Sequence, residues 1–144
     1  MTEDARSPVV GLYEMVLEVA DLAAAETFYG EVLGLPVVNR WGKERPAVWF
    51  GLGNGGFLGL WPAESGGKVA IHQGRGGAHV HFALRVPRGT LDALQARLES
   101  LEYVVEPYRF ADGNRDIYID DPDGNVVELT ELVRMWDGTP VNEP

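Results

Sequence analysis

Three polar residues of this 144-residue chain stand at matching places in two similar halves. Glu14 and His81 each precede by five residues a valine that ends a strand pattern. Glu128 lies near the end of the last strand pattern. Carboxylate oxygens and imidazole nitrogens are common ligands of divalent metal ions. An internal repeat that brings two carboxylates and one imidazole to related positions therefore predicts a metal site.

The elements that must position these residues follow one order twice. Each half starts with an alternating strand pattern, continues with a helical pattern and ends with three short strand patterns. Helices are expected over residues 22–33 and 90–101, and strands over residues 12–19, 37–41, 47–52, 56–61, 79–86, 104–110, 115–120 and 125–132. The order predicts an α+β protein made of two tandem βαβββ modules, each with one sheet face covered by its helix.

The expected helix ends differ between the halves. Asp21 and Thr90 are candidates for the N-cap, where a side-chain oxygen accepts a hydrogen bond from a free amide of the first turn. Gly34 suits the left-handed residue that follows many helices. Glu102 stands at the equivalent place in the second half, where it is a poorer helix stop.

Composition gives the domain boundaries. The first module is expected at residues 9–61, a Gly-rich linker at 62–77, the second module at 78–133 and a tail at 134–144, within one compact domain. The sheet faces that carry Glu14 and His81 have no helix over them, so a cavity is expected there.

Charge and residue content exclude several classes of function. The net charge of -10 disfavours nucleic acid and anionic membranes as partners. No apolar run is long enough to span a bilayer, and the N-terminus lacks a signal-peptide pattern, so a cytoplasmic location is expected. Since the chain has no cysteine, a metal would need histidine and carboxylate ligands.

Several short motifs together resemble the vicinal oxygen chelate superfamily, which includes glyoxalases, bleomycin-resistance proteins, fosfomycin-resistance transferases and extradiol dioxygenases. The motifs are residues 17–22 (LEVADL), 28–29 (FY), 33–35 (LGL), 81–84 (HFAL), 118–125 (YIDDPDGN) and 127–129 (VEL). Each motif alone is weak, but their order and spacing extend from Leu12 to Leu132. The resemblance implies mixed sheets that curl around a cavity with a divalent metal, and a homodimer.

The resemblance also assigns residues to the metal site. In that superfamily the ligands come from the first and last strands of each module, which implies Glu14, His81 and Glu128 as metal ligands. The fourth position falls on Gly59, which has no side chain that could bind. An open three-ligand site is therefore expected, with Mn²⁺, Fe²⁺, Zn²⁺, Ni²⁺ or Mg²⁺ as the ion. Tyr118 falls where fosfomycin-resistance enzymes place an active-site tyrosine.

Two functions remain open at the level of sequence. The first is a metal-dependent enzyme for a small organic substrate, of the lyase, isomerase, dioxygenase or transferase type, with Glu14 or Glu128 as general base and Tyr118 as a further catalytic residue. The second is a metal-free protein of the bleomycin-resistance kind that binds a cationic or aromatic compound. In that case Glu14 and Glu128 are solvated, and His81 is a hydrogen-bonded pocket residue.

Aromatic residues bear on both functions. Some of them are expected to line an apolar pocket for a flat ligand: Trp41, Trp49, Trp61, Tyr108 and Trp136. His79 lies two residues before His81 on the same strand face, where it is a half-exposed residue or an additional group of the site.

Overall fold

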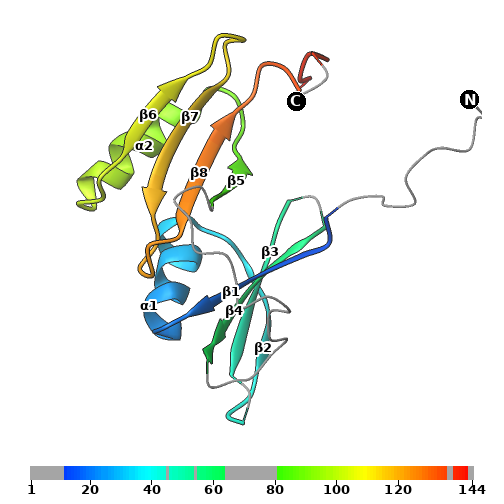
Figure 1. The fold of residues 1–144 in the computed structure, drawn as a ribbon, viewed down its shortest axis with the longest axis vertical. Coiled ribbons are helices and arrows are strands. Elements are labelled where there is room, and N and C mark those ends of the chain that lie inside the picture. Colours follow the sequence, from blue (N-terminus) through cyan, green and yellow to red (C-terminus); the bar gives the residue numbers. More distant parts are fainter. Residues whose placement is uncertain (1–11, 45, 54, 64–80, 136–137, 143–144) are drawn as a thin grey trace, which may run out of the picture. The chain divides into compact units, whose positions relative to one another are not determined.

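The computed structural model describes residues 12–44, 46–53, 55–63, 81–135 and 138–142 (Figure 1). It divides into two compact units, Met1–Val69 and Ala70–Pro144, called here the N-terminal unit and the C-terminal unit. Within the described ranges, no helix is long and apolar enough to cross a membrane. The residues that the sequence assigns to the linker, apart from Pro62 and Ala63, lie outside the described ranges, as do His79 and Trp136.

The N-terminal unit is one four-stranded mixed sheet with a helical segment against it. Its elements are β1 (Glu14–Val19), α1 (Leu22–Glu26), η1 (Thr27–Val32), β2 (Val37–Trp41), β3 (Ala47–Gly51) and β4 (Phe57–Pro62). The strand order is β1-β4-β3-β2, in which β1 runs parallel to β4 and the other neighbours are antiparallel. In sequence η1 follows α1 directly, so the two form one continuous helical segment.

The C-terminal unit repeats this arrangement. Its elements are β5 (His81–Arg85), α2 (Leu91–Ser100), β6 (Glu106–Arg109), β7 (Arg115–Asp120) and β8 (Val126–Glu131). The strand order is β5-β8-β7-β6, again with a parallel pair at one edge and antiparallel pairs elsewhere. The predicted α+β fold of two βαβββ modules is thus confirmed.

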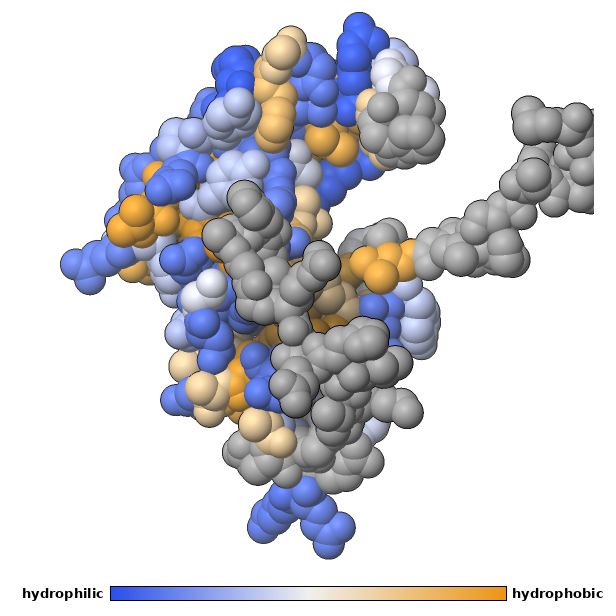
Figure 2. All heavy atoms as spheres, in the orientation of Figure 1, coloured by the Kyte–Doolittle hydropathy of each residue, from blue (hydrophilic) through white to orange (hydrophobic). Residues whose placement is uncertain are grey.

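Each unit buries its apolar residues between its sheet and its helix. In the C-terminal unit α2 contacts β7 and β8. The buried side chains there alternate along the strands, as expected for one covered face: Leu91, Leu98, Ile117, Ile119, Val127 and Leu129. The surface in Figure 2 is largely hydrophilic, with apolar residues in separate places. In the C-terminal unit the opposite sheet face carries His81, Tyr118 and Glu128, whereas in the N-terminal unit it carries Glu14 together with tryptophan side chains.

The helical segments differ in two respects from the sequence-based expectation. Only the first part of the segment after Asp21 is α-helical, and Thr27–Val32 forms a π-helix. Asp21 caps α1 as predicted, because its Oδ1 accepts a hydrogen bond of 3.0 Å from the Ala24 amide. The prediction for Thr90 is wrong, since its hydroxyl donates to the Pro87 carbonyl at 2.6 Å and makes no cap bond.

The end of α2 is strained. Glu102 has φ 67°, the left-handed conformation that Gly34 adopts with φ 77° after the first helical segment. Among the described residues, Glu102 is the non-glycine residue with positive φ. A side chain with a Cβ atom in this conformation is unfavourable by roughly 1–2 kcal/mol.

Replacing Glu102 with glycine is therefore expected to stabilise the protein. Because glycine also gains entropy in the unfolded chain, the net increase in the free energy of unfolding should be about 0.5–1 kcal/mol. Gly34→Ala is the matched opposite change and should lower it by about 1 kcal/mol. Urea denaturation of both variants measures the change in the free energy of unfolding. If both substitutions change it in the same direction, the left-handed conformation of Glu102 is not the source of strain.

Candidate functional site

The exposed sheet face of the C-terminal unit, on the side away from α2, presents polar residues in rows across the strands. We call it the polar face. Strand pairing places Glu128 of β8 beside Tyr118 of β7, and Tyr118 beside Glu106 of β6. In the next row, His81 of β5 lies beside Val126 of β8. Because side chains two apart on a strand share a face, His81 and Glu128 lie diagonally across the parallel pair.

This diagonal brings the two predicted ligands of the C-terminal unit together. His81 Nε2 lies 3.2 Å from Glu128 Oε2. The His81 side chain is 46% exposed, whereas the Glu128 side chain is only 12% exposed. The Tyr118 ring is near the imidazole, with its centroid 6.3 Å away. An imidazole, a shielded carboxylate and a phenol thus converge on one part of the polar face.

A buried carboxylate lies beside this group. Asp116 is 2% exposed and lies two residues before Tyr118 on β7. The Thr130 hydroxyl donates a 2.6 Å hydrogen bond to Asp116 Oδ1. The Tyr118 hydroxyl is 3.5 Å from Asp116 Oδ2, which makes this a weak hydrogen bond. Asp116 and Thr130 therefore form the neighbouring row of the same sheet face, beside Tyr118 and Glu128.

The environment shifts the acidity of two groups. Burial, a hydrogen bond with Asp116 and the negative charge of Asp116 raise the pKa of Glu128 from 4.5 to about 7, and a hydrogen bond from Tyr118 opposes this shift. Burial and the nearby Glu128 and Asp116 charges raise the pKa of Tyr118 from 10.0 to about 12. At neutral pH the Tyr118 phenol is thus protonated and able to donate a hydrogen bond.

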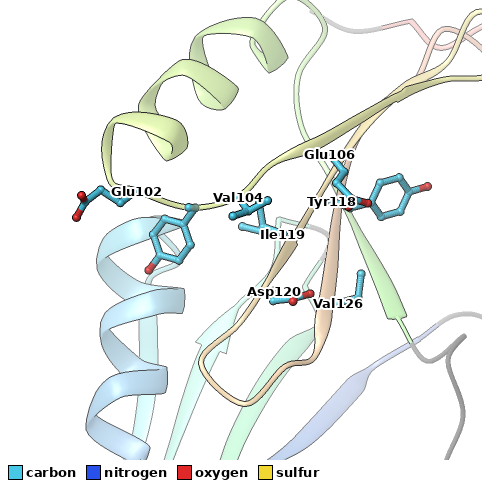
Figure 3. Close-up of a pocket in the computed structure, with 8 residues that line it drawn as sticks. Glu102, Val104, Glu106, Tyr118, Ile119, Asp120 and Val126 are labelled. Carbon is cyan, nitrogen blue, oxygen red and sulfur yellow. The ribbon is translucent and has the colours of Figure 1, made fainter.

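A pocket of about 520 Å³ opens on the β6 side of the polar face. Figure 3 shows the residues that line it, which come from the segment after α2 and from β6, β7 and β8. They are Glu102, Tyr103, Val104, Glu106, Tyr118, Ile119, Asp120 and Val126. Tyr118 thus belongs both to this pocket and to the group around His81.

The N-terminal unit carries the same diagonal with different residues. Pairing of β1 with β4 sets Glu14 opposite Phe57 and Val16 opposite Gly59. Glu14 and Gly59 therefore occupy the places that His81 and Glu128 occupy in the other unit. Glu14 is exposed, as expected for the face without a helix.

Trp49 occupies the space above Gly59. A Cβ atom built on Gly59 would lie 2.4 Å from Trp49 Cζ3, far inside contact distance. The Trp49 ring also packs against two other indoles, with centroids 6.0 Å from Trp41 and 5.8 Å from Trp61. The space over Gly59, where the resemblance implies a fourth ligand position, is thus occupied by Trp49, which belongs to an aromatic cluster of Trp41, Trp49 and Trp61.

A family model matches this chain over residues 11–129 and describes the glyoxalase/bleomycin resistance protein/dioxygenase superfamily. The chain belongs to this superfamily. A comparison with curated proteins gives no match. A solved structure of lactoylglutathione lyase from Agrobacterium tumefaciens is 34% identical, with 87% of this chain and 96% of that chain covered and a TM-score of 0.69.

Two further superfamily structures share the fold at lower identity. A glyoxalase/dioxygenase from Nostoc punctiforme is 17% identical, with 91% of this chain and 98% of that chain covered and a TM-score of 0.67. A fosfomycin resistance protein from Listeria monocytogenes, bound to Mn(II) and 1S,2S-dihydroxypropylphosphonic acid, is 20% identical. It covers 84% of this chain and 89% of its own, with a TM-score of 0.63.

The structure brings together part of the predicted superfamily ligand set. His81 and Glu128 meet within the C-terminal unit, while Glu14 belongs to the N-terminal unit. In the described ranges no group of three His, Asp or Glu side chains is gathered closely enough to hold a metal ion. The three-ligand set therefore remains a prediction.

Asp116 is the site residue that the sequence interpretation missed. In the strand pattern it reads as an ordinary polar residue at the start of β7. One signal could have identified it, because Asp116 shares its strand face with Tyr118 and pairs across the sheet with Thr130.

Proposed function

We propose that the chain is a metal-dependent enzyme of this superfamily that acts on a small organic substrate. Glu14, His81 and Glu128 would hold one divalent ion, which is Mn²⁺, Fe²⁺, Zn²⁺, Ni²⁺ or Mg²⁺. The observation that carries the proposal is the 3.2 Å approach of His81 Nε2 to Glu128 Oε2, at two positions where superfamily members are expected to supply ligands. We further propose that the enzyme is a cytoplasmic homodimer.

The donor chemistry of the site fits a divalent cation. Glu128 is shielded and lies near the buried Asp116, so its ionised form is unfavourable in the absence of a positive charge. A nearby cation would favour the ionised carboxylate and offset this repulsion. An imidazole with one or two carboxylates is a ligand set that several first-row divalent ions accept.

The positions of the side chains in the proposed site suggest a chemical role for each of them. When bound, the metal would supply Lewis-acid polarisation of substrate oxygens. The protonated Tyr118 hydroxyl would donate a hydrogen bond to a substrate oxygen, while Asp116 and Thr130 hold the tyrosine side of the site in place. Glu14 or Glu128 would accept a proton from the substrate as general base.

The fold leaves the reaction open among lyase, isomerase, dioxygenase and transferase chemistry. The similar protein from Agrobacterium tumefaciens is named a lactoylglutathione lyase. A ligand that contains glutathione carries carboxylates, which cationic side chains bind well. None of the residues that line the described pocket is basic. We therefore propose neither a glutathione substrate nor one of these four reaction types over the others.

A metal-free binding protein of the bleomycin-resistance kind is the second candidate. The observation in its favour is the aromatic cluster, because Trp49 occupies the space of the fourth ligand and Trp41 is 42% exposed. Indole faces bind flat or cationic organic molecules without a metal. Metal binding by the purified protein distinguishes the two candidates.

Metal titration tests the first candidate. Dialysed protein should take up one equivalent of Mn²⁺, Fe²⁺, Ni²⁺ or Zn²⁺, and a ligand at a hundredfold excess over its Kd should stabilise the fold by about 2.7 kcal/mol. His81→Ala should weaken metal affinity by at least about 100-fold, since loss of an outer partner alone costs 10–100-fold. Calorimetry and thermal melting measure both effects.

Gln95→Ala on α2 is the matched control, since this half-buried side chain donates a 2.8 Å hydrogen bond to its helix neighbour Glu99 and is not among the residues of the proposed metal site. It should leave metal affinity unchanged. Absence of metal uptake and of any thermal shift in the native protein would favour the metal-free candidate.

A further inference from the structure

Asp116 places a carboxylate in the interior of the C-terminal unit without an opposite charge. Its residue is 2% exposed, and among the described residues it forms no ion pair with a lysine, arginine or histidine. Burial of a carboxylate is unfavourable unless hydrogen bonds or opposite charges compensate for the lost water. The presence of Asp116 at this place therefore needs a reason other than packing.

The N-terminal unit shows that the module does not demand a carboxylate at this position. Trp49 occupies in β3 the place of Tyr118 in β7, because it pairs with the counterpart of Glu128. Two residues earlier on each strand, Ala47 is therefore the counterpart of Asp116. Ala47 is as deeply buried, with 1% exposed. A sheet of the same strand order is thus built with an apolar residue here, and the carboxylate is a special feature of the C-terminal unit.

Both carboxylate oxygens of Asp116 face hydroxyl groups. The buried Thr130 pairs with Asp116 across β7 and β8, and its hydroxyl donates to Oδ1 at 2.6 Å. The Tyr118 hydroxyl lies 3.5 Å from Oδ2, beyond the usual range for a strong bond between two oxygens. Thr130 therefore fixes the carboxylate so that its second oxygen faces Tyr118 without binding the phenol tightly.

From this arrangement we infer that Asp116 is a positioning residue, held by Thr130, that directs the hydroxyl proton of Tyr118. The inference rests on the proposed function, since it explains how the hydrogen-bond donor of the same site is kept ready. Asp116 Oδ2 attracts the phenol proton and so restricts the directions in which the freely rotating hydroxyl points. Because this contact is long, the hydroxyl can exchange it for a bond to a substrate oxygen with little loss.

The hydrogen bonding of Tyr118 can be measured in the metal-free protein. The ¹³C resonance of tyrosine Cζ, the carbon that carries the hydroxyl, responds to the hydrogen bond of that hydroxyl. In protein labelled at this carbon, Tyr118→Phe identifies the resonance of Tyr118 by its loss. Asp116→Asn retains the shape of the side chain, but the Thr130 hydroxyl needs the amide oxygen, so the amide nitrogen turns toward Tyr118. An amide donor cannot accept the phenol proton, and the resonance should therefore shift.

Substitutions of Thr130 separate its hydroxyl from its shape. Thr130→Val retains the branched shape and removes the donor to Asp116, so it should also shift the Tyr118 resonance. Thr130→Ser restores the hydroxyl and should return the resonance to its native position. Asp120→Asn is the matched control, because it makes the same change of charge at an exposed residue of the same strand and should leave the resonance in place. Backbone spectra of each variant check that the fold is retained.

A Tyr118 resonance that stays at its native position in Asp116→Asn would overturn the inference. Equal shifts in Asp116→Asn and Asp120→Asn would also overturn it, as would a shift in Thr130→Ser as large as in Thr130→Val. If Thr130→Val does not fold, the comparison of Asp116→Asn with Asp120→Asn decides. Metal titration of the native protein reports on the proposed function separately. Absence of metal uptake would overturn the metal-dependent enzyme, while the tyrosine resonance decides the role of Asp116 in either case.

Discussion

Glu128→Gln is expected to abolish metal binding and, in the same variant, to stabilise the metal-free protein above neutral pH. Metal affinity should fall by at least about 100-fold, because an amide oxygen replaces a charged ligand. The free energy of unfolding at pH 8 should rise by about 1–3 kcal/mol. A gain of stability with a loss of binding is the signature of a group held in an unfavourable charged state.

The pH dependence follows from the raised pKa of Glu128, about 7 in the folded protein against 4.5 for the free side chain. Below 4.5 the carboxyl is protonated in both the folded and the unfolded states, so it has no effect on stability. Between 4.5 and about 7 the unfolded state loses the proton first, and folding becomes less favourable. Above about 7 the full destabilisation is present, and glutamine removes it.

Urea denaturation of metal-free native and Glu128→Gln proteins at several pH values measures this effect. The difference should be small near pH 4 and should grow to a plateau above about pH 7. Glu44→Gln, an exposed carboxylate of the N-terminal unit, is the control and should show no such growth. A difference that is constant with pH would indicate that Glu128 is not held in an unfavourable environment.

Gly59→Ala is expected to destabilise the protein by about 1–3 kcal/mol, the usual cost of overpacking. The added methyl carbon would lie 2.4 Å from Trp49 Cζ3, so the indole has to move. Its movement is restricted because Trp41 and Trp61 pack against it. The cost should therefore come from the aromatic cluster rather than from the backbone.

A double-mutant cycle checks this origin. In a Trp49→Leu background the cost of Gly59→Ala should fall well below its value in the native protein, since the clashing ring is absent. Gly53→Ala is the matched control, because no atom lies within 4 Å of the position of its added carbon. If Gly59→Ala destabilises the Trp49→Leu protein as much as the native protein, the strain does not come from a contact with the Trp49 ring.

The fold could be predicted because its signals are local and occur twice. The alternating strand patterns, the Asp21 N-cap and the left-handed Gly34 each depend on interactions within a few residues. Because the second half repeats the element order of the first, the assignment of each half supports that of the other. The π-helix at Thr27–Val32, which contains the buried Phe28 and Tyr29, was not predicted. Helical periodicity in the sequence does not reveal such a change of hydrogen-bonding.

The sequence could predict those parts of the site that follow from the position of a residue along its strand. The resemblance implied that His81 and Glu128 belong to one site, and His81 Nε2 lies 3.2 Å from Glu128 Oε2. Asp116 was not recognised, because burial of a carboxylate depends on neighbours such as Thr130 from another strand. The ligand role of Glu14 still depends on the sequence and the resemblance alone.

The Trp49 ring above Gly59 has a consequence for how this chain can change. A carboxylate at position 59 would complete a four-ligand set on the model of its superfamily, but the indole bars it. Loss of the indole alone would leave a hole among the tryptophans. Two substitutions, each destabilising by itself, would therefore have to occur together before position 59 could carry a side-chain ligand.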